Sequence, residues 1–270
     1  MSEVVGVEVA DRLATVSLNR PDKLNAVSQD VFAGLARAGE RIAEDDEIRA
    51  VLIRGEGRAF CAGLDLASLQ GFAGGSNGGA GASDGGSSDA GVTRDPQAGW
   101  RIWQQMDKPV VAAVQGYALG AGFQLALAAD IRFAAEDAVM SVFEITYGLV
   151  PDLGATQFLP PIVGPARTKE LIWTAKRLTA DEALALGLVN HVVPLERLQD
   201  EARAFALDLA SRPPLPIRFT KRIVNEAGRL SLEEGMRKEI EAQAVCITSD
   251  DMREAVGAAF EKRSGTYTGT

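Results

Sequence analysis

The stretch Gly116-Tyr-Ala-Leu-Gly-Ala-Gly-Phe-Gln-Leu-Ala-Leu-Ala-Ala-Asp130 organises the rest of the chain. Before it, residues 109–115 form a short apolar run that is led by a proline and rich in valine, which predicts a buried strand. After the glycines, residues 123–129 are apolar apart from Gln124, which is typical of a helix inside a protein core. A strand is therefore expected to turn into a buried helix at this point.

The glycines at positions 116, 120 and 122 allow two interpretations. They could let a ligand reach bare backbone N–H groups at a helix N-terminus, where partial positive charge gathers. They could equally serve only to let the helix pack closely on the strand. The stretch alone does not separate the two.

Composition and charge exclude several classes of protein. The chain has 270 residues, of which 46% are hydrophobic and 24% charged, as in an ordinary globular protein. Its net charge of −9 argues against nucleic-acid binding, which depends on excess Lys and Arg. Residues at the N-terminus have no signal-peptide pattern and no apolar run is long enough to span a membrane, so we expect no membrane partner and a cytoplasmic location.

The cysteine and histidine content limits the kinds of site that are possible. Cys61 and Cys246 lie far apart and form no disulfide framework, in keeping with a reducing compartment. The single histidine, His191, cannot anchor a multi-histidine metal site, so no metal is predicted. We interpret His191 as a structural or surface residue between a helix and a strand.

Periodicity predicts alternating strands and helices. Strands are expected at 4–9, 13–18, 51–54, 131–134 and 139–142, and helices at 28–45, 179–187 and 195–211, with helical structure from 217 to 264. Residues 70–99 are dominated by Gly, Ser, Ala and Asp and predict a long flexible loop. The Gly-x-Ser-x-Gly match at 74–78 lacks the flanking strand and helix of a nucleophile elbow, so we regard it as accidental.

Two carboxylates, Glu144 and Asp152, stand among apolar and glycine neighbours. A carboxylate in such surroundings has its charged form disfavoured, which raises its pKa toward the range useful for proton transfer. The alternative is that both acids only cap loops.

Five motifs in register resemble one family. They are 60–66 (Phe-Cys-Ala-Gly-Leu-Asp-Leu), 116–122, Glu144 followed by Tyr147-Gly-Leu-Val-Pro, 187–190 (Gly-Leu-Val-Asn) and 260–263 (Phe-Glu-Lys-Arg). Together they resemble the enoyl-CoA hydratase/isomerase (crotonase) superfamily over nearly the whole chain. The resemblance implies an α/β fold, a spiral of β-β-α units over residues 1–195, followed by a helical region over 196–270 that makes trimers, often paired into hexamers.

The resemblance also implies an oxyanion hole for a CoA thioester. Its donors, carried onto this chain, are the backbone N–H groups of Leu64 and Ala121, with Gly120 and Gly122 lining the substrate pocket. Such a donor contributes about 3–4 kcal/mol in a water-poor site. The only cofactor implied is coenzyme A as part of the substrate.

The residues available for proton transfer differ from those of the family's hydratases, which use two glutamates. The later one is Glu144, but the earlier position is Gln124, and a neutral amide can only hold water or a substrate oxygen. Asp152, eight positions beyond Glu144, resembles the arrangement in the family's dienoyl-CoA isomerases. We therefore predict a double-bond shift by Glu144 and Asp152. Hydration with Glu144 as the only acid/base group is the alternative.

The CoA-binding residues implied by the resemblance are Ala62, Asp65 and Leu66, with Lys262 meeting a phosphate, possibly from a neighbouring subunit. Lys262 could also be a solvated cation at a helix end. A CoA-binding protein without turnover is a further alternative. A dinucleotide-binding fold is disfavoured because Leu125 stands where the third glycine of its fingerprint belongs.

Overall fold

The computed structural model describes residues 3–65 and 95–270. Its larger sheet has the strand order β1-β2-β3-β4-β6-β9, in which β1 and β2 form an antiparallel hairpin and the other neighbouring strands are parallel. A smaller sheet has the order β5-β7-β8. The strands are β1 Val5–Ala10, β2 Leu13–Leu18, β3 Ala50–Gly55, β4 Val110–Val114, β5 Tyr117–Leu119, β6 Ile131–Ala135, β7 Val139–Ser141, β8 Leu178–Thr179 and β9 His191–Val193.

Helices cover both faces of the larger sheet because successive strand residues point to opposite sides. On β3, Val51 and Ile53 join the core cluster that includes residues of α1 and α3, whereas Leu52 packs with alanines of α7. The helices are α1 Gln29–Glu44, α3 Ala98–Gln105, α4 Ala121–Ala128, α5 Ala155–Thr174, α6 Ala180–Ala185, α7 Leu198–Ser211, α8 Pro214–Glu226, α9 Leu232–Thr248 and α10 Asp250–Glu261. The mixed α/β architecture confirms the predicted fold class.

The opening stretch forms the expected turn from strand into buried helix. β4 leads through Gln115 and Gly116 into the short strand β5, and Gly120 then begins α4. All eight residues of α4 are buried, as the continuous apolar sequence indicates. The helix is therefore surrounded by protein, and its first turn lies beside Cys61.

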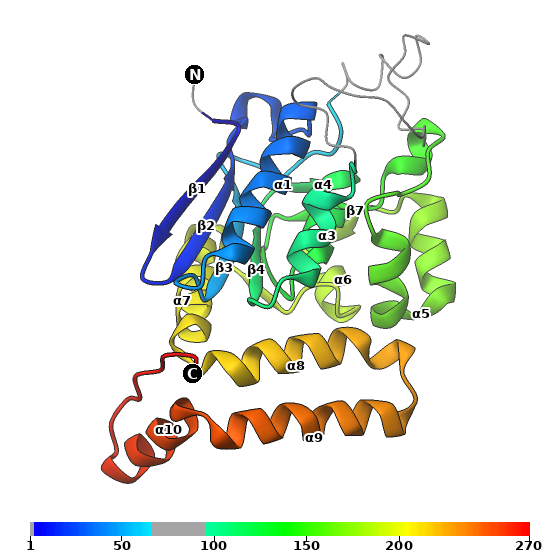
Figure 1. Ribbon diagram of the computed structural model, residues 1–270. Helices are drawn as coiled ribbons and strands as arrows, with labels where there is room; N and C mark the ends of the chain where they lie inside the picture. The colour runs from blue at the N-terminus through cyan, green and yellow to red at the C-terminus, as the bar shows by residue number, and fades with distance from the viewer. Residues whose placement is uncertain (1–2, 66–94) are drawn as a thin grey trace, which may run out of the picture.

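The C-terminal helices α8, α9 and α10 gather at one end of the molecule, away from α4 (Figure 1). From the sequence, a domain boundary was expected between residues 195 and 196, and this boundary stays a prediction. Within the second part, α7 packs on β3, β4 and β6, and its Ala202, Ala206 and Ala210 belong to the core beneath the sheet.

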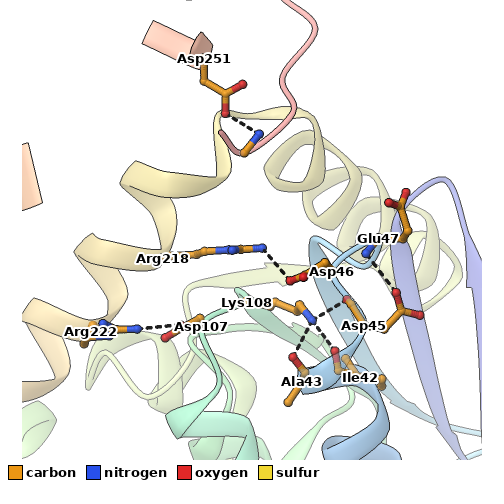
Figure 2. Close-up of polar contacts among 11 residues, drawn as sticks. Ile42, Ala43, Asp45, Asp46, Glu47, Asp107, Lys108, Arg218, Arg222 and Asp251 are labelled. Carbon is orange, nitrogen blue, oxygen red and sulfur yellow. Dashed lines mark hydrogen bonds and ion pairs between the residues drawn. The ribbon is translucent and has the colours of Figure 1, made fainter. Parts of the chain in front are cut away.

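Polar contacts fasten α8 to the rest of the fold (Figure 2). Arg218 and Arg222 of α8 reach Asp46 and Asp107, at 3.8 Å and 2.7 Å. Beside them the ammonium of Lys108 donates to the carbonyls that end α1, those of Ile42, Ala43 and Asp45. Cations at the C-terminal end of a helix are favoured by its dipole, so Lys108 also stabilises α1.

The predicted loop 70–99 lies mostly outside the described residues. Its last part is described, and there α3 already begins at Ala98. The loop prediction was therefore wrong for position 98, where α3 begins, because the buried Trp100 and Trp103 draw the segment into the core as a helix.

Candidate active site

Two chain segments run side by side at the start of α4. Cys61 N–H donates to Tyr117 O at 2.8 Å, and Leu119 N–H donates to Cys61 O at 3.0 Å. On the other side of the same segment, Val27 pairs with Leu64. These bonds bring residues 61–64, from the first motif, against residues 117–122, from the glycine-rich turn.

Close approach of these segments requires glycine at two positions. A Cβ on Gly122 would lie 2.2 Å from Cys61 O, inside the backbone of the neighbouring segment. Gly120 has φ +50, a backbone conformation that residues with a side chain rarely adopt. A Cβ added to it would lie 3.1 Å from Oε1 of Glu144. The glycines therefore serve packing, one of the two interpretations of the sequence, and they also bring the turn against an acidic side chain.

The N–H groups predicted to form the oxyanion hole stay available. Among the described residues, those of Leu64 and Ala121 donate to no protein acceptor. Ala121 is the first residue of α4, so its N–H lies at the positive end of the helix dipole. Leu64 is half-buried and belongs to the segment that lies against the turn. Two free donors on facing segments can receive an anionic oxygen.

Glu144 lies next to this turn and is 8% exposed. It begins a short 3-10 helix, residues 144–147, after β7. Its Oε1 accepts a hydrogen bond of 2.6 Å from Nε2 of Gln124 on α4, whereas its buried Oε2 has no partner. Loss of hydration on burial raises the pKa of Glu144, and the nearby charge of Asp152 raises it further, against hydrogen bonds that lower it.

Gln124 was predicted to belong to the substrate pocket, which stays a prediction, and the structure shows the protein contacts of its side chain. Its side chain is fully buried, and its Oε1 accepts from Leu153 N–H at 2.9 Å and Ala155 N–H at 3.0 Å. Together with the bond to Glu144, these contacts engage both ends of the amide with protein. The amide of Gln124 is therefore held by protein atoms from three parts of the fold.

Asp152 is exposed on the loop between Glu144 and α5. Neighbouring protein removes part of its hydration and raises its pKa. Its carbonyl accepts a 2.6 Å hydrogen bond from Nε2 of Gln97, which precedes α3. Asp152 and Glu144 thus lie close enough for their charges to interact, and the two acids differ sharply in burial.

Three residues that support this region carried no signal in the sequence analysis. The buried Asn25 donates to Glu56 O and Ala59 O and so ties the loop before α1 to the segment that leads into Cys61. Arg20 pairs with Asp65 at 2.8 Å. The indole N–H of Trp100 donates to Ala121 O at 2.9 Å and fixes the first turn of α4. Their partners are distant in sequence, so spacing could not reveal them.

The predicted CoA-binding residues are only partly brought together. Ala62 and Asp65 lie on the segment beside α4, and the N–H of Ala62 is used by Leu24 O. Leu66 lies outside the described residues. Lys262 is exposed at the end of α10, at the far end of the chain from α4 (Figure 1), so the chain's own Lys262 does not reach the site.

Metal and membrane features were searched over residues 3–65 and 95–270. In these ranges no three His, Cys, Asp or Glu side chains gather in a way that could hold a metal ion. Over the same ranges, no helix has the length and apolar character required to cross a bilayer. His191 stacks on Phe133 with ring centroids 4.3 Å apart, in agreement with its interpretation as a structural residue.

Comparison with known proteins gives a consistent result. The sequence model of the enoyl-CoA hydratase/isomerase family matches residues 8–270. The chain is 34% identical to a crotonyl-CoA hydratase of Syntrophomonas wolfei over 98% of each protein. It is 35% identical to a peroxisomal Delta(3,5)-Delta(2,4)-dienoyl-CoA isomerase of Arabidopsis thaliana, over 93% of this chain and 90% of that protein. The crystal structure of an enoyl-CoA hydratase from Mycobacterium tuberculosis superposes with a TM-score of 0.85 at 34% identity, covering 100% of both chains. The chain therefore belongs to the enoyl-CoA hydratase/isomerase family of enzymes.

Proposed function

We propose that this enzyme shifts a carbon–carbon double bond in an enoyl- or dienoyl-CoA, with Glu144 as the base. The observation that carries the proposal is the Oε2 atom of Glu144. Among the described residues it is the one buried carboxylate oxygen without a hydrogen-bond partner. A desolvated carboxylate with a raised pKa is a stronger base than one in water, which suits removal of a proton from carbon.

The reaction follows from the position of the free N–H groups. Glu144 Oε2 takes a proton from a carbon activated by the thioester, so a C–H bond breaks and an O–H bond forms. The electron pair moves toward the thioester oxygen, and the resulting enolate is stabilised by the N–H groups of Leu64 and Ala121. When the proton returns at a different carbon, the double bond has moved and Glu144 is a carboxylate again.

Asp152 is the second acid in this proposal. The relative from Arabidopsis thaliana is named as a dienoyl-CoA isomerase, which supports a role for an acid eight positions after Glu144. Asp152 is exposed and exchanges protons readily with solvent, so it suits protonation of the carbon further along the chain. Glu144 alone could also return the proton it removed.

Hydration is the alternative, and the relative from Syntrophomonas wolfei is named as a hydratase. Water addition in this family was expected to need two glutamates, and Gln124 is engaged on both ends by protein atoms. That engagement favours the double-bond shift. Hydration would then depend on Glu144 alone.

To test this, 2-enoyl-, 3-enoyl- and 3,5-dienoyl-CoA are supplied separately and the molecular masses of the products are measured. An isomer of unchanged mass is expected, and a gain of one water would instead identify a hydratase. Glu144→Gln is expected to lower kcat by about 10³-fold, within the range that general-base catalysis contributes. Unchanged turnover by Glu144→Gln would show that Glu144 is not the base, whereas a wild type that turns over none of the three substrates would support the alternative of a CoA-binding protein without catalysis.

We further propose that the enzyme uses no cofactor other than the coenzyme A of its substrate. We also propose that it works in the cytoplasm and assembles as a homotrimer or a dimer of trimers. Exposed apolar side chains on α9 and α10 support self-association. In such an assembly Lys262 would serve the site of a neighbouring subunit, because it lies far from its own.

A further inference from the structure

Gln124 is a fully buried side chain with three protein partners, which come from three parts of the fold. Its Nε2 donates to Glu144 Oε1, and its Oε1 accepts from the N–H groups of Leu153 and Ala155. Ala155 is the first residue of α5, so Gln124 satisfies one of the N–H groups that a helix leaves without an internal partner at its start. The side chain therefore joins α4, the Glu144 turn and α5.

The hydrogen-bond network allows only one orientation of this amide. Turning it over would place the NH₂ group against two N–H donors and would place its oxygen against a carboxylate oxygen, so all three bonds would be lost. Gln124 is thus a donor to Glu144. Because Nε2 already donates to Oε1, Oε2 is the oxygen of Glu144 that has no partner and is available to accept a proton.

The same contact gives the two oxygens of Glu144 different surroundings. Oε1 lies beside Gly120 and is held by a short bond to an amide, at 2.6 Å. Oε2 is buried and has no partner in the described chain. Because Gln124 holds Glu144 by Oε1, Oε2 keeps a fixed position relative to the N–H group of Ala121, the residue that follows Gly120.

A glutamate at position 124 would behave differently. It could still accept from Leu153 and Ala155, but its second oxygen would then face Glu144 Oε1 at hydrogen-bond distance. Two carboxylates this close share one proton, as neither releases it easily beside the other's charge. Glutamine keeps the three bonds and leaves Glu144 as the only titrating group of the pair.

We propose that Gln124 is a positioning residue that holds Glu144 by Oε1, reserves Oε2 for the reacting proton, and couples this base to the loop that carries Asp152. The proposal rests on the proposed function in that it takes Glu144 as the base. The charged group whose field acts on Glu144 is Asp152 on the facing loop. Gln124 adds a neutral donor, which bonds to Oε1.

The test measures the pKa of Glu144 without substrate, from the carboxyl ¹³C shift of protein labelled in glutamate. The signal is identified by its loss in Glu144→Gln. Gln124→Met keeps the side-chain length but removes the donor to the charged form, so the pKa of Glu144 is expected to rise above that of the wild type. Gln124→Glu is expected to raise it further, with two coupled titrations. An unchanged pKa in either variant would overturn the proposal.

Gln115→Met is the matched control, since Gln115 is a second buried glutamine that donates to backbone carbonyls, those of Gly55 and Gly57. It is expected to lower stability without moving the pKa of Glu144. If Gln124→Met does not fold, Gln124→Asn is used, because its shorter side chain cannot reach both partners, and the same rise is expected.

Kinetics then separate positioning from binding. Gln124→Met is expected to lower kcat about tenfold or more with KM changed less than about twofold, because the amide of Gln124 is bonded to protein atoms and acts through Glu144. A change confined to KM would contradict the proposal. If no double-bond shift is found in the wild type, the proposed function fails, but the pKa comparison still decides the role of Gln124.

Discussion

Glu144 is held in a place where its charge is disfavoured. Burial raises its pKa above the ordinary value of 4.5, and the bond from Gln124 opposes that rise. The folded protein therefore binds this proton more tightly than the unfolded chain does. The contribution of Glu144 to stability is then fully present at pH values below 4.5 and is lost as the pH rises through the raised pKa.

Glu144→Gln is expected to raise the melting temperature at pH 7, because it removes a buried charge while keeping the size of the side chain. The gain should shrink as the pH falls and vanish well below 4.5, where Glu144 is protonated in both states. Thermal unfolding at constant protein concentration over this pH range measures it. Glu8→Gln, at an exposed position of β1, is the control. A lower melting temperature of Glu144→Gln at pH 7 would contradict this account.

At the residue scale, the sequence predicted the chemical character of single residues better than the contacts that they make. The apolar and glycine surroundings of Glu144 correctly indicated a raised pKa. For Gln124 the place in the substrate pocket stays a prediction, and the residue type did not reveal its partners Leu153 and Ala155, which lie 29 and 31 positions away in the chain. No periodicity or spacing relates an amide on one helix to the first N–H groups of another.

Elements were predictable where local signals agreed. The capping box at Thr179 is present, with Glu182 as its partner, and α6 begins there as expected. The segment that became α5 gave no such signal, since Pro160, Pro161 and Pro165 all lie inside it. A break at Gly164, with φ +76 and ψ 159, separates its two parts directly before Pro165. β5 was missed because it lies inside the glycine-rich turn, and β8 because it has only 2 residues.

The attachment of α8 depends on one buried ion pair. Lys221 contacts Asp130 at 2.8 Å, with side-chain exposures of 7% and 25%, and it also donates to Trp103 O and Lys108 O. Removing one partner of such a pair leaves the other charge buried without compensation. Asp130 ends the stretch from which the fold was predicted, so this contact joins α8 to the end of α4.

Lys221→Met is expected to lower the free energy of unfolding by about 3–5 kcal/mol. Urea unfolding at one fixed protein concentration measures it. Arg222→Met is the matched control on the same helix, because Arg222 and Asp107 form a 2.7 Å pair with 53% and 45% exposure. An exposed pair contributes about 0–1 kcal/mol, so the control should change stability little. Equal losses for the two variants would show that burial of the Lys221 pair is not the cause.

Apolar side chains are exposed to solvent at the end of the molecule that α9 and α10 form. On α9, Leu232, Met236, Ile240 and Ile247 lie on one face at helical spacing, and their exposures are 80%, 53%, 71% and 54%. Met252, Val256 and Phe260 repeat every four residues along α10. A row of this kind rarely faces water in a monomer, and the proposed self-association would cover it.

Ile240→Glu is expected to break that association. A charge placed in the middle of an apolar contact loses its hydration without gaining a partner, so the assembly is disfavoured while the isolated chain keeps its fold. Sedimentation equilibrium should show a multiple of 28.6 kDa for the wild type and a value near 28.6 kDa for the variant. Val245→Glu introduces the same charge on another face of α9, at a residue that is 48% exposed, and is expected to keep the wild-type mass. Wild-type protein that sediments as a monomer would contradict self-association, and dissociation by both variants would show that the row through Ile240 is not the contact surface.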